Sequence, residues 1–373
     1  MVITQEQIDY CMECGVCTGS CPISRMMSNF SPRQMIKRTL MDRDEAVVHC
    51  RELWSCLTCA RCSVRCPAAI DFPEFVRRHR EGARKEGNVP QLAHHGTLQA
   101  IAALQTRNVK QQRTAWATDA GRIAASGDIF FFVGCAPYFE AVLKPGAGAE
   151  EVPRSVLKLL NRLGIEPVVS NDERCCGHDA LWSGDEETFR RLNRWNLEVI
   201  RGSGARTVLF SCPEGFTVFK HYLPKFFGDL PFEVLHVTEF LARELPGAGV
   251  TFKPFGESGN GGVTYQDPCR LGRQAGIFDP PRQLIAMVPG IAFVEMARNR
   301  ENSACCGTTA WMECSSCSKA LQVERLQEAQ DAGAGTIITA CPKCRIHLTC
   351  AEQNTEYSLS IKDLYAFLLQ QMA

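Results

Sequence analysis

Residues 11–22 read CMECGVCTGSCP, in which four cysteines are spaced C-x2-C-x2-C-x3-C and are followed by a proline. Residues 56–67, CLTCARCSVRCP, repeat this spacing. In such a run the first three thiolates bind one iron–sulfur cubane, whereas the fourth binds the cubane of the other run. The pattern therefore predicts two 4Fe-4S clusters. The expected ligands are Cys11, Cys14, Cys17 and Cys66 for the first cluster and Cys21, Cys56, Cys59 and Cys62 for the second.

Zinc is the alternative metal for these runs. Structural zinc usually takes its ligands as two separated pairs, so four cysteines in one short run favour clusters. Between the runs, Ser31 and Pro32 have the residue types of a helix N-cap and first turn, and residues 71–87 have a second helical pattern. We expect an all-helical di-cluster ferredoxin domain at residues 1–90, followed by a partly helical linker at 91–126.

The composition limits what else the chain can do. Its 373 residues suffice for two or three domains, and 41 basic and 41 acidic side chains leave no net charge to favour nucleic acid as a partner. The longest apolar runs, such as residues 127–135, are shorter than the ~18–20 residues that span a bilayer, and no secretory signal is recognisable. We expect a cytoplasmic protein without a membrane span, attached to a membrane only through a partner. Most of its 21 cysteines are grouped in C-x-x-C runs and C-C doublets, and these grouped cysteines are then expected to be metal ligands rather than disulfides.

From residue 127 onward the chain contains two copies of one unit. A strand-like run ends at Cys135, and a matching run, GGVTYQDPC at 261–269, ends the same way. The sequence CCG at 175–177 returns 130 residues later, and SCP at 211–213 returns as ACP 129 residues later. A shared offset at independent positions indicates a repeat. The two copies are expected to span residues 127–255 and 256–373.

Each copy alternates strand, helix, cysteine-glycine turn, helix, strand and cysteine turn, with helical patterns at 153–165 and 186–205 in the first. This order predicts a parallel α/β layer, in which ligands collect at the carboxyl ends of the strands. Four cysteines are placed there: Cys135, Cys212, Cys269 and Cys341. We expect the CCG turns to close over the same edge, with Gly177 and Gly307 letting the backbone pass close to a cluster.

The pattern C-x(30–40)-CCG-x(30–40)-C-P-x-C resembles the cysteine-rich CCG domain of heterodisulfide reductases. A helical di-cluster domain followed by two such domains resembles their D-type subunit, in which the C and B subunits are fused. The resemblance implies that five cysteines bind a noncubane 4Fe-4S cluster, and the second copy has all five: Cys269, Cys305, Cys306, Cys341 and Cys344. The first copy has four: Cys135, Cys175, Cys176 and Cys212. Because Gly215 takes the fifth place, this site is expected to bind either a further cluster or zinc.

Three charged or titratable side chains stand beside these motifs. His178 follows the first CCG, and His347 follows the second set; each either bonds to a cluster sulfur or delivers a proton, or is an ordinary structural histidine. Lys343 lies between the last two cysteines of the second set. It either raises the potential of that cluster or attracts an anionic partner, or it is a solvated loop lysine.

Four cysteines lie outside all of these sets. Cys314 and Cys317 fall one turn apart in a helix expected over residues 311–326, where a redox dithiol or extra cluster is the less favoured interpretation. Cys50 and Cys350 are interpreted as structural thiols.

The chain lacks the G-x-G-x-x-G and G-x-x-x-x-G-K-S/T patterns of flavin, NAD and ATP sites, so a partner protein must handle electron pairs. The resemblance implies an iron–sulfur electron-transfer subunit of an anaerobic oxidoreductase complex, which relays single electrons between the cubanes and a CCG cluster. Its expected partners are a flavin-containing or heterodisulfide reductase A-like subunit, or a membrane quinone-linked one. The alternative is a catalytic heterodisulfide or thiol-disulfide reductase. The missing fifth cysteine disfavours this alternative because cleavage from two sides needs two complete clusters.

Overall fold

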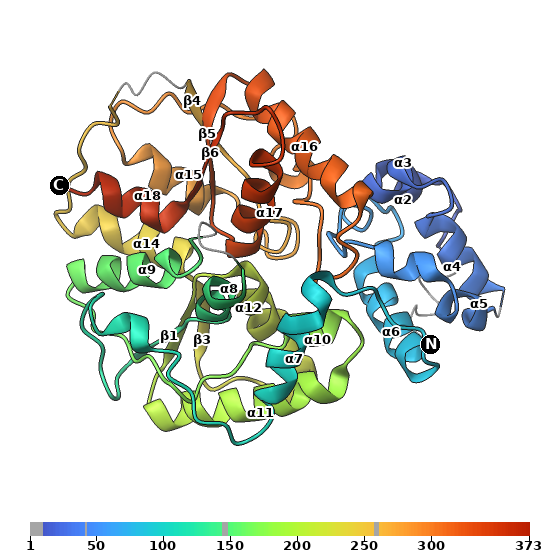
Figure 1. Ribbon diagram of the computed structural model, residues 1–373, viewed down its shortest axis with the longest axis horizontal. Coiled ribbons are helices and arrows are strands. Elements are labelled where there is room, and N and C mark those ends of the chain that lie inside the picture. Colours follow the sequence, from blue (N-terminus) through green and yellow to red (C-terminus); the bar gives the residue numbers. More distant parts are fainter. Residues whose placement is uncertain (1–9, 42, 144–147, 257–260) are drawn as a thin grey trace.

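The computed structural model describes residues 10–41, 43–143, 148–256 and 261–373. A helical N-terminal part lies to one side of two α/β units, which pack against each other (Figure 1). Residues 1–9, at the start of the expected first domain, and 257–260, near the start of the second repeat, lie outside the described residues.

The described part of residues 10–90 contains helices and no strand. The elements are α2 (Val16–Ser20), α3 (Pro22–Met26), α4 (Pro32–Leu40), α5 (Asp44–Val48), the 3-10 turn η1 (Arg51–Ser55) and α6 (Phe72–Lys85). Helix α4 begins as the sequence predicts, because the Oγ of Ser31 accepts a hydrogen bond from the backbone N–H of Gln34 at 3.2 Å. Helix α6 covers the second predicted helical segment.

The linker is partly helical, as expected. It contains η2 (Ala93–Gly96), α7 (Thr97–Leu104) and η3 (Ala115–Ala117). At its start it joins the second α/β unit, since the backbone N–H of Ala93 donates to the carbonyl of Trp311 at 2.8 Å.

The first α/β unit has a three-stranded parallel sheet in the order β1-β2-β3. Its elements are β1 (Ile129–Phe132), α8 (Ala136–Val142), α9 (Glu151–Arg162), α10 (His178–Trp182), α11 (Glu186–Ser203), β2 (Thr207–Phe210), α12 (Pro213–Thr217), the π-helical turn η4 (Val218–Tyr222), α13 (Leu223–Phe227), β3 (Glu233–His236), α14 (Val237–Glu244) and η5 (Leu245–Gly247). Helix α11 ends at Gly204, whose φ of 78° no other residue type adopts as easily.

The second unit repeats this topology with the order β4-β5-β6. Its elements are β4 (Gly262–Tyr265), α15 (Asp279–Ala286), η6 (Arg300–Asn302), α16 (Ser316–Asp331), β5 (Ala334–Thr339), α17 (Pro342–Glu352), β6 (Ser360–Asp363) and α18 (Leu364–Gln371). The structure thus confirms the repeat and its parallel sheets. The third strands, β3 and β6, were not predicted, because neither has the continuous apolar run by which the other strands were recognised.

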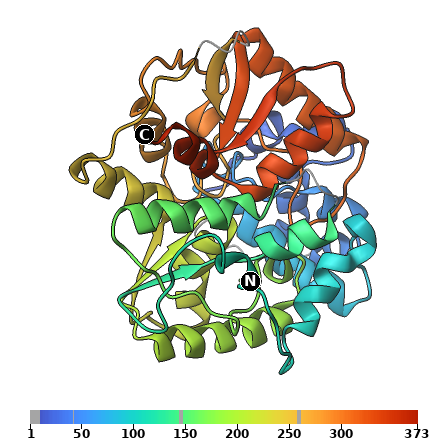
Figure 2. The same cartoon turned by 60° about the vertical axis from the view of Figure 1, so that its left-hand side comes forward.

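Helices of one unit pack on helices of the other. Helix α9 lies against α18, and α14 lies against α15 (Figures 1 and 2). The central strands are enclosed, as parallel strands covered on both faces should be: three of the four residues of β2 and all six residues of β5 are buried. No described helix is long and apolar enough to cross a membrane.

One predicted helix is wrong at its start. Helix α16 begins only at Ser316, because Trp311 and Glu313 have φ angles of 53° and 50°, which an α-helix cannot contain. Cys314 is therefore exposed in a turn before the helix and does not share a helical face with Cys317.

Candidate metal centres

The two N-terminal cysteine runs come together in the way that their spacing predicts. One cavity is lined by Cys11, Cys14, Cys17 and Cys66, and a second is lined by Cys21, Cys56, Cys59 and Cys62. Cys62 also reaches the edge of the first cavity. The last cysteine of each run thus lies with the first three of the other.

The chemistry of these thiols fits a bound cluster. All 21 cysteines are free thiols. Burial raises the pKa of Cys56 to about 12, and burial together with neighbouring thiols raises the pKa of Cys62. Buried thiols with a raised pKa, such as Cys56 and Cys62, need a positive metal centre to become thiolates, as in metal sites generally.

Arg80 donates hydrogen bonds to backbone carbonyls at the start of the second run and just before it. Its guanidinium is fully buried and donates to the carbonyls of Leu53, Trp54 and Cys56, the last at 2.7 Å. It also donates to the carbonyl of Trp182 at 3.0 Å, which ties the run to the first α/β unit. In addition, the backbone N–H of Thr58 donates to the Sγ of Cys56 at 3.4 Å.

The four cysteines of the first CCG set line one cavity together with Gly215. The Sγ atoms of Cys135 and Cys175 are 3.4 Å apart. A Cβ atom added at Gly215 would lie 3.7 Å from the Cβ of Cys176 and 3.1 Å from Cδ1 of Phe210. Residue 215 therefore faces this set, so the fifth thiol of the pattern is absent from the cavity that the four cysteines line.

Buried polar groups position this first set. Glu173 accepts hydrogen bonds from the backbone N–H groups of Val133 and Gly134 at 2.9 and 2.8 Å, and it pairs with Arg113 at 2.8 Å. Glu173 thereby holds the turn that leads to Cys135. Burial raises its pKa to about 7, although Arg113 and the two N–H donors oppose this effect.

Two asparagines of α11 hold the first CCG turn. Asn196 donates to the carbonyl of Cys175 at 3.1 Å, and Asn193 donates to the carbonyl of Cys176 at 3.0 Å. The turn cannot shift without breaking these buried bonds, whose loss costs about 1–3 kcal/mol each.

Thiol contacts join all five cysteines of the second set. They connect Cys269 to Cys305, Cys305 to Cys306, Cys306 to Cys344, and Cys344 to Cys341. The thiols of Cys305 and Cys344 lower the pKa of Cys306 to about 6. The structure therefore brings together every cysteine that the second copy was expected to contribute.

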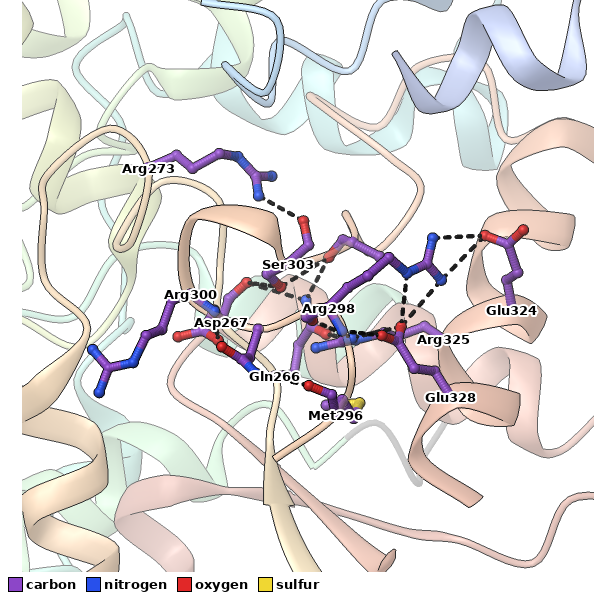
Figure 3. A network of polar contacts seen from close by, with 12 residues as sticks. Gln266, Asp267, Arg273, Met296, Arg298, Arg300, Ser303, Glu324, Arg325 and Glu328 are labelled. Carbon is purple, nitrogen blue, oxygen red and sulfur yellow. Dashed lines mark hydrogen bonds and ion pairs between the residues drawn. The ribbon is translucent and has the colours of Figure 1, made fainter. Parts of the chain in front are cut away.

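A polar network fixes the two loops that carry Cys269 and Cys305 (Figure 3). Asp267 binds Arg282 at 2.7 and 2.9 Å and accepts from the backbone N–H of Arg300 at 2.9 Å. The Oγ of Ser303 donates to the carbonyl of Asp267 at 3.2 Å, and the buried Arg325 donates to the side chain of Gln266. The segment before Cys305 is thus tied to the segment before Cys269.

The CCG glycines are needed for the turn itself. Gly177 and Gly307 have φ angles of 77° and 86°. A Cβ at residue 307 would lie 2.6 Å from the carbonyl oxygen of Ser318 in α16, and a Cβ at residue 177 would lie 2.9 Å from Phe189 in α11. The glycines therefore allow a left-handed turn packed on a helix, and their close approach to a cluster stays a prediction.

Lys343 is buried, which contradicts its interpretation as a solvated loop lysine. Its side chain reaches the cavity of the first set, where its Nζ lies 2.5 Å from Asp179 and 2.7 Å from Glu214. Burial opposes its charge, but the two carboxylates raise its pKa well above the usual value. They also neutralise it, so it has no free charge with which to attract an anionic partner.

The two histidines differ in their contacts: His178 lines the cavity of the first set and no described group bonds to its Nε2, whereas the Nε2 of His347 is bonded to Thr308. The Nδ1 of His178 lies 2.9 Å from Oδ1 of Asp179, beside Lys343. The Nε2 of His347 hydrogen-bonds to Thr308 at 3.0 Å, and burial lowers the pKa of His347 to about 3. His347 is therefore uncharged at neutral pH.

Two arginines of the second α/β unit donate hydrogen bonds to the loop between Cys56 and Cys59. Arg270 donates to the carbonyl of Thr58 at 2.8 Å, and Arg273 donates to the carbonyl of Cys59 at 2.7 Å. Neither arginine was predicted to be part of a site, although both closely follow Cys269. Their position next to a ligand was the only signal, and it did not indicate which residues they would contact.

Comparisons with known proteins agree with this arrangement. The family model of the cysteine-rich domain named CCG matches residues 129–220 and again 263–349, and the model of a 4Fe-4S dicluster domain matches residues 7–70. The D-type subunit of dihydromethanophenazine:CoB–CoM heterodisulfide reductase from Methanosarcina acetivorans is 28% identical, with 98% of this chain and 94% of that protein aligned.

Two other relatives are longer proteins. The EtfAB:quinone oxidoreductase of Syntrophomonas wolfei is 28% identical over 80% of this chain and 43% of its own length. The B-type subunit of fumarate reductase (CoM/CoB) from Methanothermobacter marburgensis is 27% identical over 91% of this chain and 67% of its own length.

Proposed function

This chain belongs to the iron–sulfur proteins that combine a 4Fe-4S dicluster domain with two CCG domains, and on this premise we propose that it is an electron-transfer subunit of a larger anaerobic oxidoreductase. When bound, iron–sulfur clusters accept and release single electrons. The observation that carries the proposal is the contact of Arg270 and Arg273 with the Cys56–Cys59 loop. This contact supports the proposal because Arg270 and Arg273 closely follow Cys269 of the proposed CCG ligand set and bind the loop of the proposed second cubane site.

The proposed division of the chain follows the fold. Residues 1–90 form the di-cluster domain, 91–126 the linker, 127–255 the first CCG domain and 256–373 the second. The proposed cubane ligands are the two interleaved sets: Cys11, Cys14, Cys17 and Cys66, and Cys21, Cys56, Cys59 and Cys62. The five connected thiols of the second CCG domain are proposed to hold a noncubane 4Fe-4S cluster.

The first CCG site is proposed to hold a cluster or zinc through four thiolates: Cys135, Cys175, Cys176 and Cys212. Four thiolates suffice for either a cubane or a tetrahedral zinc ion. The site is proposed to serve a relay or structural role, because Gly215 brings no fifth thiol.

Other subunits are part of the proposal, since relatives are named as subunits of oxidoreductases. The proposed partner carries a flavin or resembles heterodisulfide reductase A, or it is a quinone-linked membrane protein. Such a partner would convert electron pairs into the single electrons that this chain carries.

A disulfide reductase is the weaker candidate. Cleavage of a disulfide between the two CCG sites would require open space there. The buried side chains of Lys343, Asp179 and Glu214 occupy this region and pair with one another.

Metal counting under anaerobic conditions tests the proposal. We expect about twelve irons with one zinc, or about sixteen irons if every site holds a cluster, together with EPR signals that appear on reduction. Fewer than about eight irons in reconstituted protein would contradict it. Turnover of a small disulfide would favour the reductase instead.

A further inference from the structure

A cavity of about 490 Å³ lies beside the second α/β unit and is separate from the four thiol sites. Its wall combines the linker at His94, the end of α8 at Leu143, and residues before and within α16 and α17. The two cysteines that line it, Cys314 and Cys350, belong to none of the proposed ligand sets. Its volume is within the range of about 300–1000 Å³ that small-molecule sites in proteins have.

The wall carries positive charge and hydrogen-bond donors, and no carboxylate is among the described residues that line it. The ammonium of Lys319 donates to the Sγ of Cys350 at 3.1 Å, and within the described ranges no carboxylate lies within ion-pair distance of it. A half-buried ammonium without an anion favours binding of one, because the low-dielectric surroundings strengthen the attraction.

A buried donor in the same wall also has no acceptor. Trp311 is 1% exposed and lines the cavity, and no described group accepts a hydrogen bond from its Nε1–H. Buried donors are nearly always satisfied in native proteins, by protein, water or ligand. The indole of Trp311 is held firmly by ring contacts with His94, Phe139 and His347, at centroid distances of 5.5, 5.3 and 4.9 Å.

The backbone around Trp311 is strained. Ala310, Trp311 and Glu313 have φ angles of 50°, 53° and 50°, and His94 across the cavity has 51°. Such conformations persist only where the surrounding structure enforces them, and they cluster at binding sites. Here the hydrogen bonds between residues 91–93 and 311–313 enforce them.

We propose that this cavity binds a small organic carboxylate. Its anionic group contacts Lys319 and the Nε1–H of Trp311, and its apolar body packs against Leu143, Met312 and Ile346. The lining residues Thr308 and His347 closely follow the cysteine motifs of the second CCG set in the chain, so the bound carboxylate lies beside that set. The inference goes beyond electron transfer and does not depend on which metal the neighbouring site holds.

The rate at which Cys350 is alkylated measures binding at this site, because its Sγ accepts a hydrogen bond from Lys319. Iodoacetate, a small carboxylate, and iodoacetamide, its neutral counterpart, both alkylate a thiolate: the sulfur–carbon bond forms, iodide leaves, and the thiol proton goes to water. With the anaerobic holoprotein, the rate of Cys350 modification is followed by peptide mass spectrometry. We expect the rate to saturate with iodoacetate and to rise linearly with iodoacetamide. An excess of 3-phenylpropionate should slow the iodoacetate reaction at least tenfold, whereas 3-phenylpropanol should not.

Variants separate binding from thiol reactivity. Lys319→Met should lower the ratio of iodoacetate to iodoacetamide rates at least tenfold, Lys319→Arg should keep it within about threefold, and Trp311→Phe should raise the half-saturating concentration several-fold. Lys253→Met, at an exposed position outside the cavity, is the matched control. Linear kinetics with both reagents, or an unchanged ratio in Lys319→Met, would overturn the proposal. Iron content, measured on the same samples, reports on the electron-transfer function separately.

Discussion

Replacing Gly215 with cysteine tests what sets the cofactor of the first CCG site. A Cβ at this position would lie 3.7 Å from the Cβ of Cys176. Pairs of cysteines that share a bond have Cβ atoms about 3.5–4.5 Å apart. The new thiol would therefore lie within reach of Cys176, and the first copy would then have the five-cysteine pattern of the second.

The cost of the substitution comes from one neighbour. The added Cβ would lie 3.1 Å from Cδ1 of Phe210, so this buried ring would have to move by a few tenths of an ångström. Overpacking of this kind costs about 1–3 kcal/mol. Gly215→Ala has the same Cβ without the thiol, so it is the matched control for packing.

Metal analysis and EPR of Gly215→Cys, Gly215→Ala and the parent protein give the result. If the parent site holds zinc, we expect Gly215→Cys to gain about four irons per chain and to lose the zinc. If the parent site holds a cubane, the iron count should stay the same and the EPR signal of that site should change. Gly215→Ala should match the parent in both respects. Identical metal content and spectra in all three proteins would refute the idea that residue 215 sets the cofactor.

Three further predictions follow from the structure. Lys343→Met should destabilise the protein by about 3–5 kcal/mol, because it leaves Asp179 and Glu214 as buried carboxylates without a cation. Thermal unfolding should show that adding Asp179→Asn and Glu214→Gln recovers most of the lost stability. A loss of stability no larger than that caused by Lys362→Met would contradict this. Cys66→Ala should remove the iron of the first cubane site, although Cys66 belongs to the second run. Cys50→Ala, the control, should keep the full iron content. Equal iron counts in the two variants would disprove the interleaved ligand sets. Because burial raises the pKa of Cys56 to about 12, its thiol is protonated without metal and must release a proton when it binds metal. Transfer of iron to a chelator should therefore speed up as the pH is lowered from about 8.5 to about 5.5. A transfer rate that is independent of pH would argue against this account.

Much of the local structure was predictable because its signals lie within a few residues of one another. Ser31 and Pro32 mark the start of α4, and the apolar runs before Cys135 and Cys212 mark β1 and β2. The repeat offset predicted that the second sheet copies the first, and the order β4-β5-β6 agrees. The start of α16 was predicted wrongly, because Trp311 packs against His94 and Phe139, from distant parts of the chain, in a left-handed turn.

The cysteine spacing predicts which thiols could act together, because the ligand spacing of a cluster is a property of short segments and of their repetition. The surroundings of those sites depend instead on how distant segments fold together. Lys343 pairs with Asp179, 164 residues away in the chain, and Arg270 reaches Thr58 across 212 residues. Burial and charge pairing depend on which distant segments exclude water from a side chain, and no local pattern records that. For the same reason, no local pattern predicts the cavity at Lys319 and Trp311, which separate parts of the chain enclose.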